Sequence, residues 1–237
     1  MSQLYFRQLL AGRDFARDDP LAPQMVNFVY LIGDRDTGDA VAVDPAYGVG
    51  ELVERLEADG LRLTGVLATH WHPDHLGGDL LGYPIEGIRE LLGRADVQAP
   101  VHVQASEAEW VKRATGVADH DLVRHESGDV VEVGHVPIRL LHTPGHTPGS
   151  QCFVLDGKLV AGDTLFLDGC GRTDFPGGDS DEMYRSLRQL ATLPGDPTVF
   201  PGHWYSAEPS ASLSEVKRSN YVYRAADLEQ WRMLMGG

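Results

Sequence analysis

Cysteine is scarce in this chain: among its 237 residues, two are cysteines, Cys152 and Cys170. Two cysteines cannot build a disulfide framework, so the fold must rest on its apolar core, and a reducing compartment is the simplest setting. Long apolar runs are also lacking, and none approaches the roughly 20 residues that a membrane span needs. The segment from Met1 to Gly12 is too short and too polar for a signal peptide. These absences predict a cytoplasmic protein with no membrane partner.

Basic side chains are few as well: the chain has 20 Lys and Arg residues and 35 Asp and Glu residues, which gives a formal net charge of −15. This balance repels the phosphates of nucleic acids, so no nucleic-acid partner is expected. Internal repeats, low-complexity tracts and Pro/Ser-rich linkers are missing too. With 42% hydrophobic residues, the composition predicts one folded domain spanning residues 1–237 and leaves the oligomeric state open.

Short apolar segments between turn signals predict the order of the elements. Strands are expected at residues 27–32, 40–43, 63–68, 101–103, 129–133, 136–141, 151–155, 159–161 and 198–200. Helices are expected at residues 49–59, 106–114 and 180–192, the last capped by Ser180, and in the tail from residue 210. Segment 82–100, which Gly and Pro punctuate, is expected to be a loop with a helical turn. The order favours an α/β fold of two packed sheets with helices outside.

Histidine and aspartate side chains gather where predicted strands end. His70, His72, Asp74 and His75 stand within six residues, directly after strand 63–68. His146, Asp163 and His203 each lie in a turn that follows another strand, where loops carry function on a rigid scaffold. Imidazole and carboxylate groups suit zinc, iron and manganese. The sequence therefore predicts a metal site built from seven side chains: His70, His72, Asp74, His75, His146, Asp163 and His203.

The motifs around these residues carry a family resemblance. HxHxDH (70–75), TPGHTPGS (143–150), GDTLF (162–166) and PGH (201–203) resemble the metallo-β-lactamase superfamily, over about residues 27–205. The resemblance implies an αββα sandwich with its metal site at one edge of the sheets. It also implies two divalent metal ions, with zinc first and iron or manganese as alternatives. Position by position, His70, His72 and His146 resemble the ligands of one ion, Asp74, His75 and His203 those of the other, and Asp163 the bridging carboxylate.

Two branches of the superfamily share further residues with this chain. Segment 162–172, GDTLFLDGCGR, is similar to glyoxalase II, and its continuation RTDF (172–175) is similar to the persulfide dioxygenases. In the glyoxalase II branch, residues at the positions of Arg172 and Tyr205 contact glutathione. The chain after His203 is too short for the helical domain that completes that glutathione site. The stretch from His75 to His146 is longer than in that branch, and the surplus around 82–100 is expected to cap the site.

The resemblance implies a hydrolase in which a metal-activated hydroxide attacks a carbonyl carbon. Asp74 would bind metal and orient this nucleophile, and Arg172 and Tyr205 would contact a small, anionic thioester or related acyl substrate. A persulfide dioxygenase with one iron on His70, His146 and Asp163 is the alternative. A binding domain without turnover is a third interpretation. Ribonuclease activity is disfavoured by the charge, and nothing marks the thiol of Cys170 as an activated nucleophile.

Overall fold

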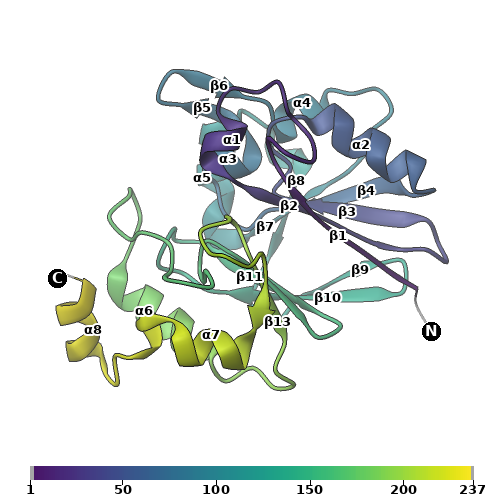
Figure 1. The fold of residues 1–237 in the computed structure, drawn as a ribbon. Coiled ribbons are helices and arrows are strands. Elements are labelled where there is room, and N and C mark those ends of the chain that lie inside the picture. The colour runs from purple at the N-terminus through teal and green to yellow at the C-terminus, as the bar shows by residue number, and fades with distance from the viewer. Residues whose placement is uncertain (1–2, 236–237) are drawn as a thin grey trace.

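The computed structural model describes residues 3–235 and contains two six-stranded sheets packed face to face. Helices cover the outer side of each sheet, so four layers follow one another from top to bottom in Figure 1. This arrangement confirms the αββα sandwich that the sequence predicted. Among the helices of residues 3–235, none combines the length and the apolar character that crossing a lipid bilayer demands.

The first sheet has the strand order β1-β2-β3-β4-β7-β8. Its strands are β1 (Leu4–Leu10), β2 (Phe28–Asp34), β3 (Asp39–Val43), β4 (Arg62–Leu67), β7 (Val101–Gln104) and β8 (Leu122–His125). Strands β1 to β3 pair antiparallel, and β3, β4, β7 and β8 pair parallel. Parallel neighbours need crossovers, which α2 (Val49–Ala58), α4 (Ile88–Leu92) and α5 (Ala108–Thr115) supply. The short helices α1 (Ala22–Met25) and α3 (Pro73–Leu76) lie in loops of this half.

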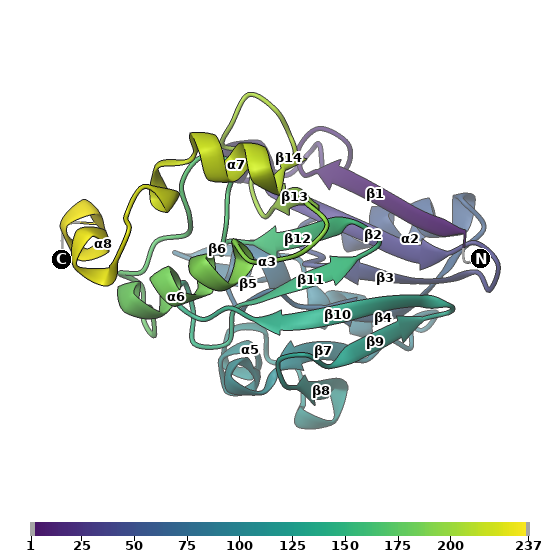
Figure 2. The ribbon, with the colours of Figure 1, turned by 90° about the horizontal axis from the view of Figure 1, so that it is seen from below.

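The second sheet has the order β14-β13-β12-β11-β10-β9. Its strands are β9 (Val130–Val133), β10 (Val136–His142), β11 (Gln151–Leu155), β12 (Lys158–Gly162), β13 (Thr198–Pro201) and β14 (Ala211–Ser212). Helices α6 (Ser180–Leu190), α7 (Leu213–Ser219) and α8 (Leu228–Met235) lie on its outer face, as Figure 2 shows. The buried indole of Trp231 in α8 donates a hydrogen bond to the carbonyl oxygen of Ser180 at 2.7 Å and so fixes α8 to α6.

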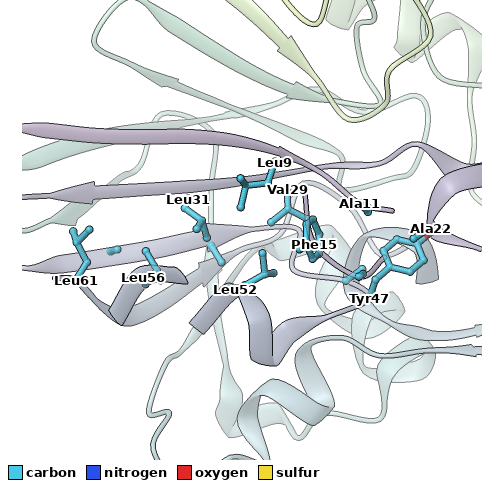
Figure 3. Close-up of a cluster of buried hydrophobic side chains, with 14 of the residues drawn as sticks. Leu9, Ala11, Phe15, Ala22, Val29, Leu31, Tyr47, Leu52, Leu56 and Leu61 are labelled. Atoms are coloured by element: carbon cyan, nitrogen blue, oxygen red, sulfur yellow. The ribbon is translucent and has the colours of Figure 1, made fainter. Parts of the chain in front are cut away.

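Strand β2 is buried along its whole length because both of its faces are covered. Tyr30 and Ile32 pack between the sheets against residues such as Phe153 of β11. Leu31 points the other way and packs with Leu52 in the cluster between the first sheet and α2 (Figure 3). The sequence of a strand that is covered on both faces is a continuous run of apolar residues, without the alternation of apolar and polar residues that a half-exposed strand has.

Several predicted elements need correction. Strands β1 and β8 were not predicted, and segment 82–100 contains strand β6 (Tyr83–Ile85) besides the expected helical turn, which is α4. The cap of α6 is Asp179 and not Ser180, because the carboxylate of Asp179 accepts the backbone N–H of Glu182 at 2.9 Å. The segment from Met1 to Gly12, which was predicted not to be a signal peptide, contains the whole of β1. Its first two residues, Met1 and Ser2, lie outside the described residues.

Candidate metal centre

The seven predicted metal ligands lie together at one end of the sandwich. They come from the loops that follow β4, β10, β12 and β13, four strands of the two sheets. Six of the seven side chains are buried, and His72 is partly exposed. The donors form two groups of three, with the remaining carboxylate close to both.

The first group consists of His70, His72 and His146. The Nδ1 atom of His72 lies 3.1 Å from Nε2 of His70 and 3.0 Å from Nε2 of His146. Two nitrogens that each bind one tetrahedral zinc ion at about 2.1 Å are about 3.4 Å apart. The spacing of these three atoms is therefore suitable for a single metal ion.

The second group consists of Asp74, His75 and His203. The Nε2 atoms of the two histidines are 3.2 Å apart. A carboxylate oxygen of Asp74 lies 3.5 Å from Nε2 of His75 and 3.4 Å from Nε2 of His203. The three donor atoms again have the separation that one ion requires.

Asp163 lies beside both groups. Its Oδ2 atom is 3.6 Å from Nε2 of His146 in the first group and 3.3 Å from Nε2 of His203 in the second. Its Oδ1 atom is buried and has no hydrogen-bond partner among the described residues. A buried carboxylate oxygen without a donor is costly unless a cation satisfies it. Gly202 packs so close that a Cβ there would lie 2.3 Å from this oxygen. The site therefore fits a metal on the chemistry of its donors.

Four of the five histidine rings are fixed through the nitrogen that faces away from the cluster. These Nδ1 contacts are His70 with the hydroxyl of Thr69 at 2.9 Å, His75 with Asp44 Oδ2 at 3.0 Å, His146 with the Arg172 carbonyl at 2.6 Å, and His203 with the Met25 carbonyl at 2.7 Å. Such partners hold the ring orientation and leave the inward nitrogen free to bind a metal.

Two residues that the sequence analysis did not single out hold the centre in shape. Asp44 follows β3, has a left-handed φ of 51°, and accepts the N–H of Thr69 at 2.7 Å and its hydroxyl at 2.5 Å. Asn27 precedes β2 and donates to a carboxylate oxygen of Asp74 at 3.0 Å. Asp44 stands at a strand end like the predicted ligands, and this position was the one signal that could have revealed it.

Opposite charges balance one another in this buried centre. Burial lowers the pKa of His75, but the carboxylates of Asp74, Asp163 and Asp44 act against it and raise that pKa to about 10. Burial raises the pKa of Asp163, yet His203 and His75 hold it well below its usual range. Asp163 therefore stays ionised, as the binding of a cation requires.

A cavity of about 670 Å³ opens onto the centre, and its walls include His72, Asp74, Asp163 and His203. This volume is in the range of small-molecule sites. Both predicted substrate contacts also line it. The guanidinium of Arg172 makes two hydrogen bonds to Asp174, at 2.9 and 2.6 Å. Tyr205 is 54% exposed.

Tyr205 stacks on the imidazole of His203, with ring centroids 4.8 Å apart and an interplanar angle of 5°. The guanidinium of Arg172 lies over the ring of Phe175 at 4.5 Å. Cys170 lines the cavity as well, and burial raises the pKa of its thiol to about 12. This thiol stays protonated near neutral pH, which agrees with the interpretation that it is not a nucleophile.

The remaining histidines lie outside the two groups. His135 forms a further set of possible donors with Asp34 and Asp36. The Oδ2 atom of Asp34 already accepts the backbone N–H of His135 at 2.8 Å and lies 2.7 Å from its Nδ1. This carboxylate is therefore satisfied within the chain, whereas the Oδ1 atom of Asp163 has no hydrogen-bond partner among the described residues.

Comparisons with known proteins show which family and fold this chain resembles. The model of the Metallo-beta-lactamase superfamily matches residues 22–203. A hydroxyacylglutathione hydrolase of Bradyrhizobium sp. (strain ORS 278) is 38% identical over 209 residues, which cover 87% of this chain and 74% of that protein. The mitochondrial persulfide dioxygenase ETHE1 of Homo sapiens is 32% identical over 207 residues, which cover 84% of this chain and 72% of that protein. The crystal structure of ETHE1 from Myxococcus xanthus superposes with a TM-score of 0.79 at 32% identity, covering 98% of this chain and 90% of that one.

Proposed function

The chain belongs to the metallo-beta-lactamase superfamily, and we propose that it is a metal-dependent hydrolase of thioesters or related small acyl substrates. The observation that carries this proposal is the presence of two complete donor groups with the Asp163 carboxylate beside both. Hydrolysis at a two-metal site uses both groups. A single iron would leave the second group without a catalytic role.

In this proposal His70, His72 and His146 would hold one divalent ion, Asp74, His75 and His203 would hold a second, and Asp163 would contribute its carboxylate to both. Zinc suits these imidazole and carboxylate donors best, and iron or manganese suits them too. When bound, such ions supply a water that ionises near neutral pH and a Lewis acid for a carbonyl oxygen.

The chain's own groups prepare the reaction. Asp74 lines the cavity, and the amide of Asn27 fixes one of its oxygens. From there its carboxylate can accept a hydrogen bond from the attacking water and so aim it at the substrate. Water adds to the thioester carbonyl carbon, the C–S bond breaks, and the products are a carboxylic acid and a thiol.

We further propose that Arg172 and Tyr205 contact the substrate, which is small. Arg172 is the basic side chain among the described residues of the cavity wall. An anionic substrate group would have to replace Asp174 as the partner of its guanidinium. Because that ion pair is exposed, the exchange costs little.

A second candidate is a mono-iron persulfide dioxygenase with His70, His146 and Asp163 as ligands. It is favoured by the likeness to ETHE1 of Myxococcus xanthus over 98% of the chain. The segment RTDF at 172–175 supports the same branch.

Metal content and two activity assays distinguish the candidates. We expect two metal equivalents per chain and cleavage of thioesters by the zinc-loaded protein. Oxygen uptake that depends on a persulfide, in iron-loaded protein without thioester cleavage in any metal form, would establish the dioxygenase instead. His203→Ala sharpens the comparison, because it removes a donor of the second group alone. Hydrolysis should be lost in this variant, whereas a dioxygenase with iron on the other donors should retain activity.

A further inference from the structure

A two-stranded hairpin stands next to the candidate metal centre. Strands β5 (Gly78–Leu80) and β6 pair with each other and belong to neither large sheet. The hairpin follows α3 directly, and α3 carries Asp74 and His75. Figure 1 shows it as a projection at the edge of the molecule, close to α3. The tip of the hairpin therefore lies close in sequence to Asp74 and His75 of the second donor group.

The turn of this hairpin has an unusual residue. Leu81 and Gly82 form the two-residue loop, and both have positive φ, 54° and 91°. Such loops are type I′ turns, which favour Asn, Asp or Gly at the first position because a larger side chain is strained there. Leucine thus contradicts the local turn chemistry, and departures of this kind are expected at functional positions.

The side chain of Leu81 is also unusual in its surroundings. It is 94% exposed, the highest value among the exposed large apolar residues of the described chain. Leu81 and its neighbour Leu80 nevertheless line the cavity of the metal centre. Phe175 and Tyr221, which are both partly exposed, line the same cavity. Exposed apolar side chains that gather around one cavity indicate a binding site for an apolar group.

The charged residues around the cavity also favour an apolar ligand. Asp79 and Asp168 line the cavity, and the guanidinium of Arg172 is already paired with the carboxylate of Asp174. Asp79 belongs to the hairpin itself, where it accepts the N–H of Gly82 at 2.8 Å. No lysine or arginine of the described chain reaches the cavity from the hairpin. This wall consequently suits an uncharged apolar group better than an anionic one.

We propose that the β5–β6 hairpin is a substrate-binding lip, and that Leu80 and Leu81 hold an apolar acyl group. The inference rests on the proposed hydrolase function and specifies its substrate class: thioesters of medium-chain aliphatic or aromatic acids. The exposed leucine loses its contact with water when such a group binds, which supplies the affinity.

Leu81→Asn tests this inference without damaging the hairpin, since Asn suits the first position of a type I′ turn. The variant should melt at the wild-type temperature or above it. Its kcat/KM for octanoyl-N-acetylcysteamine should fall about tenfold or more, because the apolar contact between Leu81 and the bound octanoyl chain is lost. Its kcat/KM for the acetyl thioester should stay within about twofold of wild type, because that acyl group is too short to bury the leucine. Leu234→Asn on α8 makes the same substitution at an exposed leucine outside the cavity. This control variant should alter neither kcat/KM value.

A binding measurement separates this inference from the proposed reaction. The probe is the octanoyl thioester analogue in which a methylene replaces the sulfur, titrated calorimetrically into wild type and Leu81→Asn. Tighter binding to wild type by about tenfold supports the lip, even if no metal form cleaves a thioester and the hydrolase proposal fails. Equal binding to both proteins overturns the lip, whether or not thioesters are cleaved. An equal loss of kcat/KM for acetyl and octanoyl substrates also overturns it.

Discussion

The carboxylate of Glu107 accepts the hydroxyl hydrogen of Thr147 at 2.7 Å, a contact between residues that are 40 positions apart in the sequence. The same oxygen accepts the backbone N–H of Trp71 at 2.9 Å, and the other oxygen accepts that of Gly149 at 2.6 Å. Trp71 stands between His70 and His72, and Thr147 follows His146. One buried side chain therefore links the two loops that carry the first donor group.

Glu107→Gln should weaken the hold on both loops. The amide of glutamine presents N–H atoms where one of the backbone or hydroxyl donors now points, which leaves a buried polar group unsatisfied at a cost of about 1–3 kcal/mol. We expect the melting temperature to fall by about 2–10 °C and zinc affinity to fall roughly 10- to 100-fold. Chelator competition and thermal unfolding measure the two effects. Glu109→Gln, at an exposed position of α5, is the control, and wild-type values in Glu107→Gln would contradict this role.

A second prediction concerns the carboxylate beside both donor groups. Asp163→Ala should lower the metal content at both positions and abolish turnover, because its oxygens are the ones that approach histidines of each group. Elemental analysis after zinc loading and dialysis should give less than one equivalent. Asp168→Ala changes an exposed aspartate of the same cavity and should keep the full complement. An Asp163→Ala protein with wild-type metal content and rate would show that the carboxylate does not lie between two ions.

That the seven proposed metal ligands lie together could be predicted because each stands in a short motif at the end of an apolar strand. Their supporting residues could not, since hydrogen bonds such as that from Asn27 to Asp74 join segments 47 positions apart and leave no local pattern. Asp44 has the right place after a strand but no ligand-type neighbour in sequence to draw attention to it.

Strand β1 escaped prediction for a different reason. Arg7 and Gln8 interrupt its apolar residues, and its place is fixed by antiparallel pairing with β2, in which Arg7 faces Leu31 across the ladder. Strand β8 lies at the sheet edge, where two of its four residues are exposed. Tertiary pairing determines such strands more than their own composition does.

A histidine pair outside the metal centre gives a prediction for pH dependence. His102 Nδ1 lies 2.8 Å from Nε2 of His125, and burial together with that neighbour lowers the pKa of His102 from 6.5 to about 4. Between these values the unfolded chain binds the proton more readily than the folded one. The stability that the neutral ring provides is therefore complete above pH 6.5 and is lost as the pH falls toward 4.

We expect His102→Asn to lose less stability than wild type when the pH is lowered through this window. Denaturant unfolding of both proteins at a series of pH values gives the difference directly, and the histidines of the metal centre contribute equally to both curves. His120→Asn, at a histidine whose side chain is 85% exposed, should follow the wild-type curve. Parallel curves for His102→Asn and wild type would refute the assignment.

The last prediction tests whether Arg172 contacts the substrate. Its guanidinium is exposed and paired with Asp174, so its removal should cost the fold little. A contact to a remote anionic group acts on ground state and transition state alike, and Arg172→Ala should then raise KM for an anionic thioester while kcat stays nearly constant. A neutral thioester should show no change in KM, because it offers nothing for the guanidinium to bind. Arg185→Ala removes another exposed arginine with an acidic partner, on α6, and should leave both substrates unaffected. If Arg172→Ala instead lowers kcat for both substrates at constant KM, the residue acts through the loop whose carbonyl holds His146, and the substrate contact must be assigned elsewhere.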